Sequence, residues 1–574
     1  EPKSGAIRRI YFFPRPLNPV MKTDILFGRS AIYIITFLMG GCGLAYEYTF
    51  SKIASDLLGN SVQQWAIIIG LMMFCMGIGS DIQKYIKDTH IFDRFILFEI
   101  ILGLIGGFGP ILLILVFGYS RDHFVPAQYG LSIITGILIG LEIPVLARFN
   151  ERYTPDLKLN IGGILRMDYI GAFIGALAWI FFLPRFFTLT QTGFILGLIN
   201  NIVAGVALLY FAKLAKNKFI LSVFVIVSVA ALGYGMLKVP AWTSYAEQRL
   251  FLNPIVYSKT TSYQHIVITQ HFSGDIFCYI NGHLQFYSND EYIYHEFLVH
   301  PAMHISQQRK RILILGGGDG LAVREVLKYK EVASITLVDI DPEMTDIAKN
   351  NPYLSSLNRG SLKHSRVTII KNRAITPGKK TAVPIKNRAR PLSQEFAQGT
   401  EISIINMDAA KFIEQAPGLF DVIIIDFPDP NSLELSKLYS KGFYQKIYHK
   451  LSRNGIFVQQ SSSPFFTQRA FICIGKTIKS AGFATVPVHE NVPSFGEWGW
   501  WLGCKKDFMT ENRLRHSLQE IDSLSIETQY LTPPLIKASL DFGKNVHFNN
   551  EDIKINTILN NIIYKYYVEE LKEK

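Results

Sequence analysis

Two aspartates separated by two residues follow a short apolar segment in the second half of the chain. Val422–Ile425 is typical of a buried strand, and Asp426 and Asp429 follow it in the order Asp-Phe-Pro-Asp-Pro. Open α/β sheets place ligand-binding groups at the carboxyl ends of their strands. A carboxylate there can accept a proton from an attacking amine or hold a cationic amine. The spacing is equally typical of a turn, because Asp-Pro favours turns.

A glycine-rich turn lies between a predicted strand and a predicted helix. The strand is Arg311–Leu315, the turn is Gly316-Gly-Gly-Asp-Gly320, and the helix is expected at about 321–329. Glycines let the backbone approach a ligand closely, and a helix N-terminus offers free N–H groups. The next strand ends at Asp339, and an acidic group there suits a ribose. The turn is not G-x-G-x-x-G, so alone it indicates any nucleoside-binding enzyme, including a methyltransferase.

The elements that must position these residues alternate between strands and helices. Further strands are expected at Ser334–Val338 and Gly455–Gln459. This alternation predicts a parallel, doubly wound, Rossmann-like sheet. A small β region precedes the sheet, because Tyr263–Gln270 alternates like a strand and Cys278–Phe286 contains Asn281-Gly282, which is typical of a tight hairpin turn.

The first half of the chain has a different character. The 574 residues are 49% hydrophobic and 18% charged, with a net charge of +12, and apolar runs dominate the part before residue 239. Each run is near the roughly 20 residues that cross a bilayer core. The chain is therefore predicted to begin with a multi-pass helical membrane bundle, and the first run is too long for a cleavable signal. The seven runs lie at about 30–49, 61–80, 93–118, 125–147, 162–183, 191–212 and 218–237.

Several ionisable residues lie within or at the edges of these runs. Charged groups are costly in lipid and usually face a bundle interior or a cavity. They are consistent with an acidic path for a cation, and also with interhelical hydrogen bonds or interfacial positions. The residues are Glu47, Glu99, Glu142, Arg166 and Asp168.

A series of motifs along residues 255–505 resembles the spermidine synthases, a group of polyamine aminopropyltransferases. The apolar half resembles the multi-pass bacterial branch of that family through Leu58-Gly-Asn-Ser-Val62, Gly77-Ile-Gly-Ser80 and Asp168-Tyr-Ile-Gly171-Ala, which implies the bacterial inner membrane. The motifs of the second half are Tyr263-Gln264, Asn281-Gly-His-Leu-Gln285, Asp290-Glu-Tyr-Ile-Tyr294-His295-Glu296, Gly316-Gly-Gly-Asp-Gly320, Asp426-Phe-Pro-Asp-Pro430 and Leu438-Tyr-Ser440.

The resemblance implies transfer of an aminopropyl group from decarboxylated S-adenosylmethionine to a putrescine-like di- or polyamine, with methylthioadenosine released. Asp426 then accepts the proton of the attacking amine, while Tyr294 and Asp429 contact the amine substrate. A sulfonium is a good leaving group, so positioning and a base suffice, and no metal is expected. The donor site implied by the family consists of Gln264, His295, Gly316, Gly318, Asp319, Asp339 at the ribose and Asp408 at the adenine.

One stretch departs from the soluble members, which carry Tyr-Pro-Ser-Gly near the amine site. Here the stretch runs Val492-Pro-Ser-Phe-Gly-Glu497-Trp498-Gly-Trp500-Trp501, without the tyrosine. Glu497, with Trp498 beside it, is predicted to recognise the distal ammonium of a different or longer amine. The alternative is a capped strand with packed tryptophans.

A basic insertion at about 371–403 is the second departure. It contains Lys and Arg with Pro and Gly, a composition that suits docking onto anionic lipid or a solvated loop. Nucleic-acid binding is not expected, because interleaved aromatic residues are missing.

Two arguments disagree on which side of the membrane the second half of the chain lies. With seven spans the Lys/Arg-rich loops share a side with the N-terminus, so the positive-inside rule places the second half outside the cytosol. The donor implied by the resemblance is cytosolic, which favours a cytoplasmic catalytic domain, and we expect that side.

Two alternative functions stay open. The fold is shared with S-adenosylmethionine-dependent methyltransferases. The other alternative is a polyamine carrier or sensor with a weakly active enzyme-like domain, motivated by the polar residues in the apolar runs.

A homodimer is expected from the family alone. The expected divisions are a basic segment at 1–29, a transmembrane domain at 30–238, a small β domain at 239–305, a Rossmann-like aminopropyltransferase domain at 306–508 and a polar, weakly helical C-terminal tail at 509–574.

Overall fold

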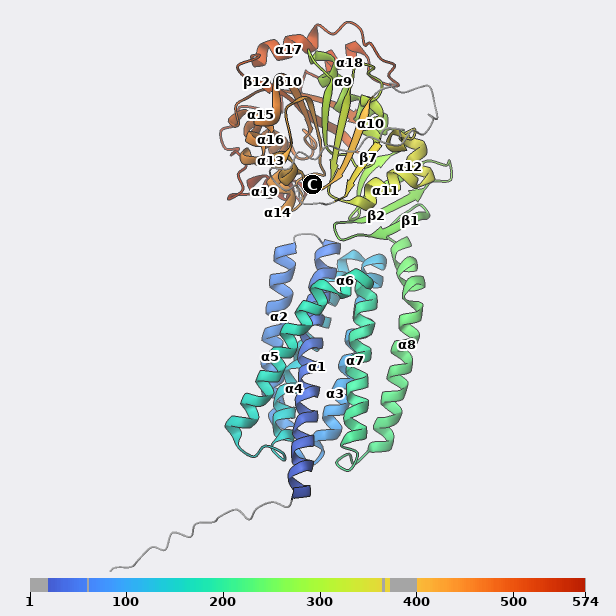
Figure 1. Cartoon of the computed structure of the whole chain (residues 1–574), viewed down its shortest axis with the longest axis vertical. Coiled ribbons are helices and arrows are strands. Elements are labelled where there is room, and N and C mark those ends of the chain that lie inside the picture. The colour runs from blue at the N-terminus through green and yellow to red at the C-terminus, as the bar shows by residue number, and fades with distance from the viewer. Residues whose placement is uncertain (1–18, 59–60, 364–366, 372–399, 573–574) are drawn as a thin grey trace, which may run out of the picture. The chain divides into compact units, whose positions relative to one another are not determined.

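The computed structural model describes residues 19–58, 61–363, 367–371 and 400–572 (Figure 1). The chain divides into two compact units, Glu1–Leu250 and Phe251–Lys574. Most of the basic insertion, residues 372–399, lies outside the described residues, as does much of the basic segment, residues 1–18.

The first unit is helical, and its described residues contain seven helices long and apolar enough to cross a membrane. Their positions confirm the seven predicted runs, although the last helix continues to Gln248, beyond the expected end near 237. The long helices are α1 (Pro19–Leu58), α2 (Ser61–Ile82), α3 (Ile91–Tyr119), α4 (Arg121–Asn150), α5 (Leu157–Phe181), α7 (Leu189–Tyr210) and α8 (Lys218–Gln248); the short elements are η1 (Gln83–Tyr85), η2 (Asp88–His90) and α6 (Leu183–Phe186).

Glycines let these helices pack with their backbones in contact. A Cβ on Gly171 of α5 would lie 1.9 Å from the Phe37 carbonyl oxygen of α1. A Cβ on Gly197 of α7 would lie 2.3 Å from the Gly103 carbonyl oxygen of α3. Small residues at such crossings are typical of helix pairs in lipid.

The second unit begins with a four-stranded antiparallel sheet. Its strands are β1 (Ile255–Thr260), β2 (His265–Gln270), β3 (Ile276–Ile280) and β4 (His283–Tyr287). Asn281 and Gly282 join β3 to β4 with φ values of 51° and 80°, which confirms the predicted hairpin turn. The sequence patterns did not predict β1.

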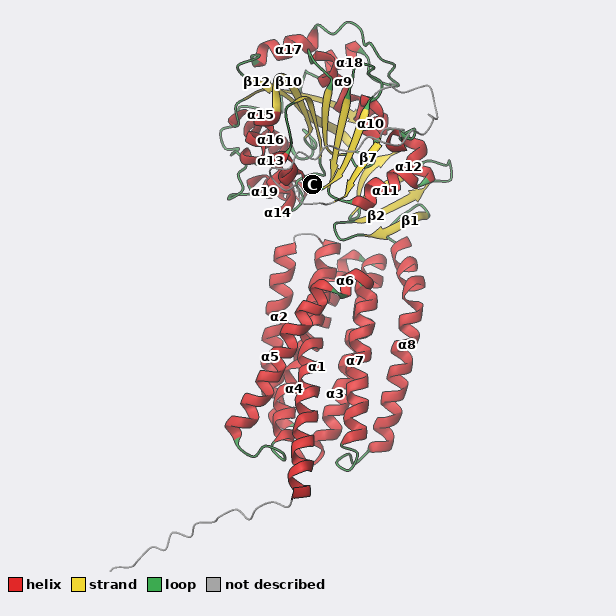
Figure 2. Ribbon diagram, in the orientation of Figure 1, coloured by secondary structure: helices red, strands yellow, loops and turns green. Residues whose placement is uncertain are grey.

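An eight-stranded sheet in the order β11-β12-β10-β9-β5-β6-β8-β7 forms the centre of this unit (Figure 2). The six strands from β10 to β7 are parallel, as predicted, whereas β12 runs antiparallel to β10 and to β11. Only three residues join β11 to β12, too few for a parallel crossover. The strands are β5 (Arg311–Gly316), β6 (Ser334–Asp339), β7 (Val367–Lys371), β8 (Glu401–Asn406), β9 (Phe420–Asp426), β10 (Leu451–Gln460), β11 (Phe483–Val492) and β12 (Gly496–Lys505).

Alternate residues of the parallel strands face two separate hydrophobic cores. Ile312 and Ile314 of β5 pack in the core that includes α9, α10 and α17, while Leu313 and Leu315 pack in the core that includes α13, α15, α16 and α19. The helices are α9 (Glu291–Ile305), α10 (Leu321–Val326), α11 (Pro342–Asn350), α12 (Pro352–Leu357), α13 (Ala409–Gln415), α14 (Leu433–Ser436), α15 (Lys441–Lys450), α16 (Gln468–Ser480), α17 (Glu511–Gln519), α18 (Pro533–Ala538) and α19 (Ile562–Lys572), with η3 (Ser361–Lys363) and η4 (Lys437–Tyr439).

Two sequence-based expectations differ from these elements. Helix α10 ends at Val326, three residues before the expected end. The segment after 509, expected to be polar and weakly helical, contains three helices with buried faces that include Leu514, Ile536 and Ile563. Its apolar residues are spaced too widely for a local pattern to reveal that they complete both cores.

Candidate active site

The carboxyl ends of β5, β6 and β9 bring the predicted site residues to one edge of the sheet. Gly316 of β5 pairs in register with Asp426 of β9, and Asp339 is the last residue of β6. The loop after β5 therefore begins between the two aspartates.

The glycine-rich turn can follow this path only with glycine. Gly316, Gly317 and Gly320 have φ values of 83°, 63° and 79°, in the left-handed region. A Cβ on Gly316 would lie 2.0 Å from the Asp426 carbonyl oxygen. The turn thus approaches β9 backbone to backbone.

Asp339 is held by the backbone of the turn. The Gly318 amide donates to Asp339 Oδ2 at 3.0 Å, and the Asp341 amide donates to Oδ1 at 2.8 Å. Burial raises the Asp339 pKa to about 7, with the charges of Asp341 and Asp319 acting in the same direction. A proton on this carboxyl, or a ligand hydroxyl donating to it, satisfies such a site.

Gln264 and Asp408 flank this edge of the sheet. Gln264 lies between β1 and β2, and its side chain forms a hydrogen bond with Asp341. Asp408 is the N-cap of α13, where its Oδ1 accepts from the Lys411 amide at 2.9 Å. The adjacent Met407 amide donates to the Asp339 carbonyl oxygen at 3.0 Å, so Asp408 lies one residue from the Asp339 strand end.

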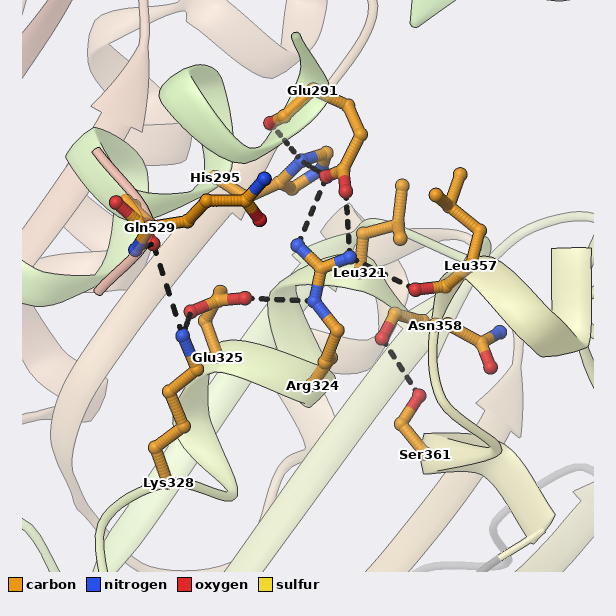
Figure 3. Close-up of polar contacts among 12 residues, drawn as sticks. Glu291, His295, Leu321, Arg324, Glu325, Lys328, Leu357, Asn358, Ser361 and Gln529 are labelled. Carbon is orange, nitrogen blue, oxygen red and sulfur yellow. Dashed lines mark hydrogen bonds and ion pairs between the residues drawn. The ribbon is translucent and has the colours of Figure 1, made fainter. Parts of the chain in front are cut away.

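His295, Asp319 and Asp426 converge although they come from α9, the turn and β9. One side-chain atom from each lies within 4.8 Å of the others. His295 Nδ1 also faces Glu291 Oε2 at 2.8 Å, and Arg324 donates to both Glu291 oxygens at 2.6 and 3.0 Å (Figure 3). Burial opposes the charge on His295, but the hydrogen bond and charge of Glu291, with Asp319 and Asp426, raise its pKa to about 9.

This charge state bears on metal binding. Three such side chains have the composition of a metal site, but an imidazole must be neutral to ligate a metal. The raised pKa of His295 favours an imidazolium that balances Asp319 and Asp426 instead.

Tyr294, one residue earlier on α9, contacts the proposed base directly. Its hydroxyl donates to Asp426 Oδ1 at 2.6 Å. Burial raises the Asp426 pKa to about 6, and the nearby Asp319 charge adds to this, while His295 and Tyr294 oppose it. A carboxylate with this pKa is ionised at neutral pH and is a stronger base than an exposed aspartate.

Asp429 has a separate set of partners, all of them uncharged donors. The Tyr567 hydroxyl donates to Oδ2 at 2.9 Å, Ser462 Oγ to Oδ2 at 3.3 Å, and Gln460 Nε2 to Oδ1 at 3.5 Å. Burial raises the Asp429 pKa to about 6, and these three hydrogen bonds lower it. The carboxylate keeps acceptor capacity for a cationic ligand.

Glu497 and Trp498 do not lie together. They are consecutive residues of β12, so their side chains point to opposite faces of the sheet. Glu497 Oε1 pairs with His489 Nδ1 of β11 at 2.9 Å. Trp498 lies 5.0 Å from Phe495 between ring centroids, and Phe495 lies 6.3 Å from Tyr294, so only Trp498 lies on the side of Tyr294.

Sequence reasoning missed several residues that hold the site. Arg324 and Glu291 carried a signal, because a charged pair within otherwise apolar helices is usually buried and paired. Ser462, Gln460 and Tyr567 carried none, because their link to Asp429 depends on long-range packing.

The sequence is similar to known proteins along most of its length. The sequence matches the Spermine/spermidine synthase domain over residues 291–386 and 385–514. It is 36% identical over 554 residues to a polyamine aminopropyltransferase of Leptospira interrogans, covering 94% of this chain and 99% of that protein. The chain belongs to the polyamine aminopropyltransferase family.

Two other bacterial relatives support the same membership. Polyamine aminopropyltransferase 1 of Ralstonia nicotianae is 34% identical, covering 89% of this chain and 90% of that protein. Polyamine aminopropyltransferase 1 of Streptomyces coelicolor is 33% identical, covering 97% and 98%. A solved spermidine synthase from Thermotoga maritima is 23% identical with a TM-score of 0.37, covering 50% of this chain and 84% of that one.

Proposed function

We propose that the second unit transfers an aminopropyl group from decarboxylated S-adenosylmethionine to a putrescine-like di- or polyamine. The amine nitrogen attacks the propyl carbon bonded to the sulfonium, the carbon–sulfur bond breaks, and its electron pair stays on sulfur. The products are a spermidine-like amine and methylthioadenosine. The nitrogen loses a proton, for which Asp426 is the base.

The observation that carries this proposal is the placement of Asp426. Its carboxylate lies at the end of β9 beside the glycine-rich turn, accepts from Tyr294, and converges with His295 and Asp319. A base with a raised pKa thus adjoins the turn proposed to hold the donor.

The donor side of the proposal follows from the other strand ends. Asp339 is proposed to accept from the ribose hydroxyls, with Gly318 giving the sugar close access to the backbone. Asp408 is proposed to contact the adenine amino group. Gln264, whose side chain forms a hydrogen bond with Asp341, is proposed to line the other side of the donor site. His295 and Asp319 each have a side-chain atom within 4.8 Å of Asp426.

On the amine side, Asp429 is proposed to bind an ammonium group and Tyr294 to line its path. Trp498 is proposed to offer an aromatic face on that side, where cation–π attraction suits an ammonium. A role for Glu497 in amine binding requires its ion pair with His489 to open.

An Asp426→Asn variant tests the function. Aminopropyl transfer, followed by mass analysis of the amine products, should fall by roughly 100- to 10,000-fold. Methylthioadenosine binding by calorimetry should persist, and Asp522→Asn at an exposed ion pair with Lys537 should behave as wild type. Unchanged turnover in Asp426→Asn would remove the aspartate from the mechanism.

The same assay separates the methyltransferase alternative. The donor proposed here lacks the carboxylate of S-adenosylmethionine. Tighter binding of S-adenosylmethionine, with a methylated rather than an aminopropylated product, would assign the chain to the alternative chemistry.

We further propose that the seven long helices span the bacterial inner membrane and that the second unit faces the cytosol. The length and apolar composition of the helices support the first statement. The cytosolic origin of the donor supports the second, against the Lys/Arg distribution of the loops.

One observation favours a carrier role beside the enzyme. Glu99 on α3 and Glu142 on α4 are buried and share a side-chain hydrogen bond, and no Lys or Arg of the described residues forms an ion pair with either carboxyl. Uptake of labelled amine into liposomes, lost in Glu142→Gln but kept in Glu47→Gln, would support carriage; absence of uptake by the wild type would end it.

A further inference from the structure

The C-terminal helix α19 contributes a side chain to the proposed amine site. Tyr567 lies 138 residues after Asp429 in sequence, yet its hydroxyl donates to Asp429 Oδ2 at 2.9 Å. This is the shortest of the three donations to that carboxylate. The tyrosine side chain is 8% exposed, so its ring is enclosed by protein.

Helix α19 is fixed independently of this contact. The Glu570 carboxylate accepts from the Arg469 amide at 2.9 Å, where α16 begins, and Arg469 pairs with Glu569 at 3.1 Å. In the segment that precedes α19, Asn556 Nδ2 donates to the Ser436 carbonyl oxygen at 2.8 Å. The position of Tyr567 is therefore fixed by contacts of its own segment as well as by Asp429.

The remaining partners leave Asp429 open to a cation. Ser462 and Gln460 donate at 3.3 and 3.5 Å, and no Lys, Arg or His in the described parts of the chain pairs with this carboxylate. An unneutralised carboxylate in a half-buried position attracts an ammonium group, and fixed neutral donors set the direction of its free lone pairs.

We propose that Tyr567 is a positioning residue for the amine substrate: it orients the Asp429 carboxylate toward the ammonium group and sets the affinity for the amine. This rests on the proposed function, in which Asp429 binds the amine. It assigns to the C-terminal segment a part in substrate selection that the spacing of the sequence motifs does not indicate.

The chain supplies a matched control in the next residue. Tyr566 is also buried, but its hydroxyl donates to the Asp552 carbonyl oxygen at 3.3 Å and accepts from the Lys554 amide at 3.2 Å, away from Asp429. Tyr567→Phe and Tyr566→Phe each remove one buried hydroxyl and keep the ring.

The experiment measures both substrates on the full chain in detergent. Tyr567→Phe should raise the KM for putrescine by about tenfold, because a hydrogen bond to a charged group is lost, and leave the KM for decarboxylated S-adenosylmethionine unchanged. Ser462→Ala should change the putrescine KM in the same direction by less, and Tyr566→Phe should change neither value.

The pH dependence of putrescine binding adds a readout that a purely structural role would not move. Tyr567 lowers the Asp429 pKa, so without it the loss of binding on acidification should begin at a higher pH in calorimetry with methylthioadenosine present. Equal KM values in wild type and Tyr567→Phe, or equal effects of Tyr567→Phe and Tyr566→Phe, would overturn this inference while leaving transfer intact. Absence of transfer by the wild type would instead overturn the proposed function.

Discussion

The two aspartates of the site differ in what surrounds them although each has a pKa near 6. Asp426 contacts a tyrosine and lies beside the imidazolium of His295, whereas Asp429 has only neutral donors. In the first environment the imidazolium and the tyrosine hydroxyl favour the ionised carboxylate, so that Asp426 is ready to accept a proton. The second suits a carboxylate that stays ionised to hold a cation.

The Asp426 environment predicts a specific pH dependence of kcat. Because the base must be ionised, kcat should fall by about tenfold per pH unit below the pKa of about 6 and level off above it. Tyr294→Phe removes a hydrogen bond that favours the ionised form, so its acidic limb should move to higher pH. Steady-state kinetics from pH 5 to about 8, with the donor saturating, measure both profiles. Coincident profiles would contradict the contact.

At the scale of elements, the turn after β5 is shaped by the neighbouring strand ends. Gly316 meets the β9 backbone, and Gly318 meets the side chain at the end of β6. Any displacement of the turn therefore acts directly on Asp426, the proposed base, and on Asp339, the proposed ribose ligand.

A Gly318→Ala substitution should reveal this dependence. Its Cβ would lie 2.6 Å from Asp339 Oδ2, so the turn and the carboxylate must separate. We expect kcat/KM for the donor to fall by roughly 100-fold, as for a misplacement near 1 Å. Gly442→Ala in α15, whose Cβ would meet Ile558 at an ordinary 3.7 Å, should leave it unchanged.

The charge network between α9 and α10 predicts a stability effect. Arg324→Met leaves the Glu291 carboxylate without its bidentate partner in a buried position, at a cost of about 3–5 kcal/mol. Thermal unfolding of the full chain in detergent should show a lower midpoint. Adding Glu291→Gln to this variant should restore part of the stability, since the buried Glu291 charge is then removed together with its Arg324 partner; further loss would argue against the network.

At the scale of the whole molecule, a helical unit is joined to a catalytic one. The side of the membrane on which the catalytic unit lies can be measured with introduced cysteines. All five are buried, so an introduced exposed cysteine is the thiol available to a reagent. In right-side-out vesicles, Lys213→Cys should react with an impermeant maleimide, and Ser273→Cys only after permeabilisation. The reverse pattern would place the second unit outside the cytosol, as the Lys/Arg distribution indicates.

Local patterns in the sequence were sufficient for much of the fold. The helices, the Asn281-Gly282 hairpin and the turn before Leu321 each depend on a few neighbouring residues. The antiparallel strands at the edge of the large sheet and the hydrogen bond from Tyr567 to Asp429 depend on contacts between distant segments. A pattern of neighbouring residues does not predict such contacts. Glu497 and Trp498 were assigned together from adjacent positions, but adjacent residues of one strand point to opposite faces, and only contacts between segments show which of the two lies on the side of Tyr294.

Helix α9 carries Tyr294 and His295 on one side and is attached to its surroundings on the other. Glu296 accepts from three consecutive amides, Gln529 at 2.6 Å, Tyr530 at 2.9 Å and Leu531 at 2.8 Å, and His300 pairs with Glu325 at 2.9 Å. Any local opening of α9 would break all four of these buried contacts. Its amide hydrogens should therefore exchange with deuterium only when the whole unit unfolds, more slowly than those of α11 or α17, so that the helix holding Tyr294 and His295 is also among the last to open.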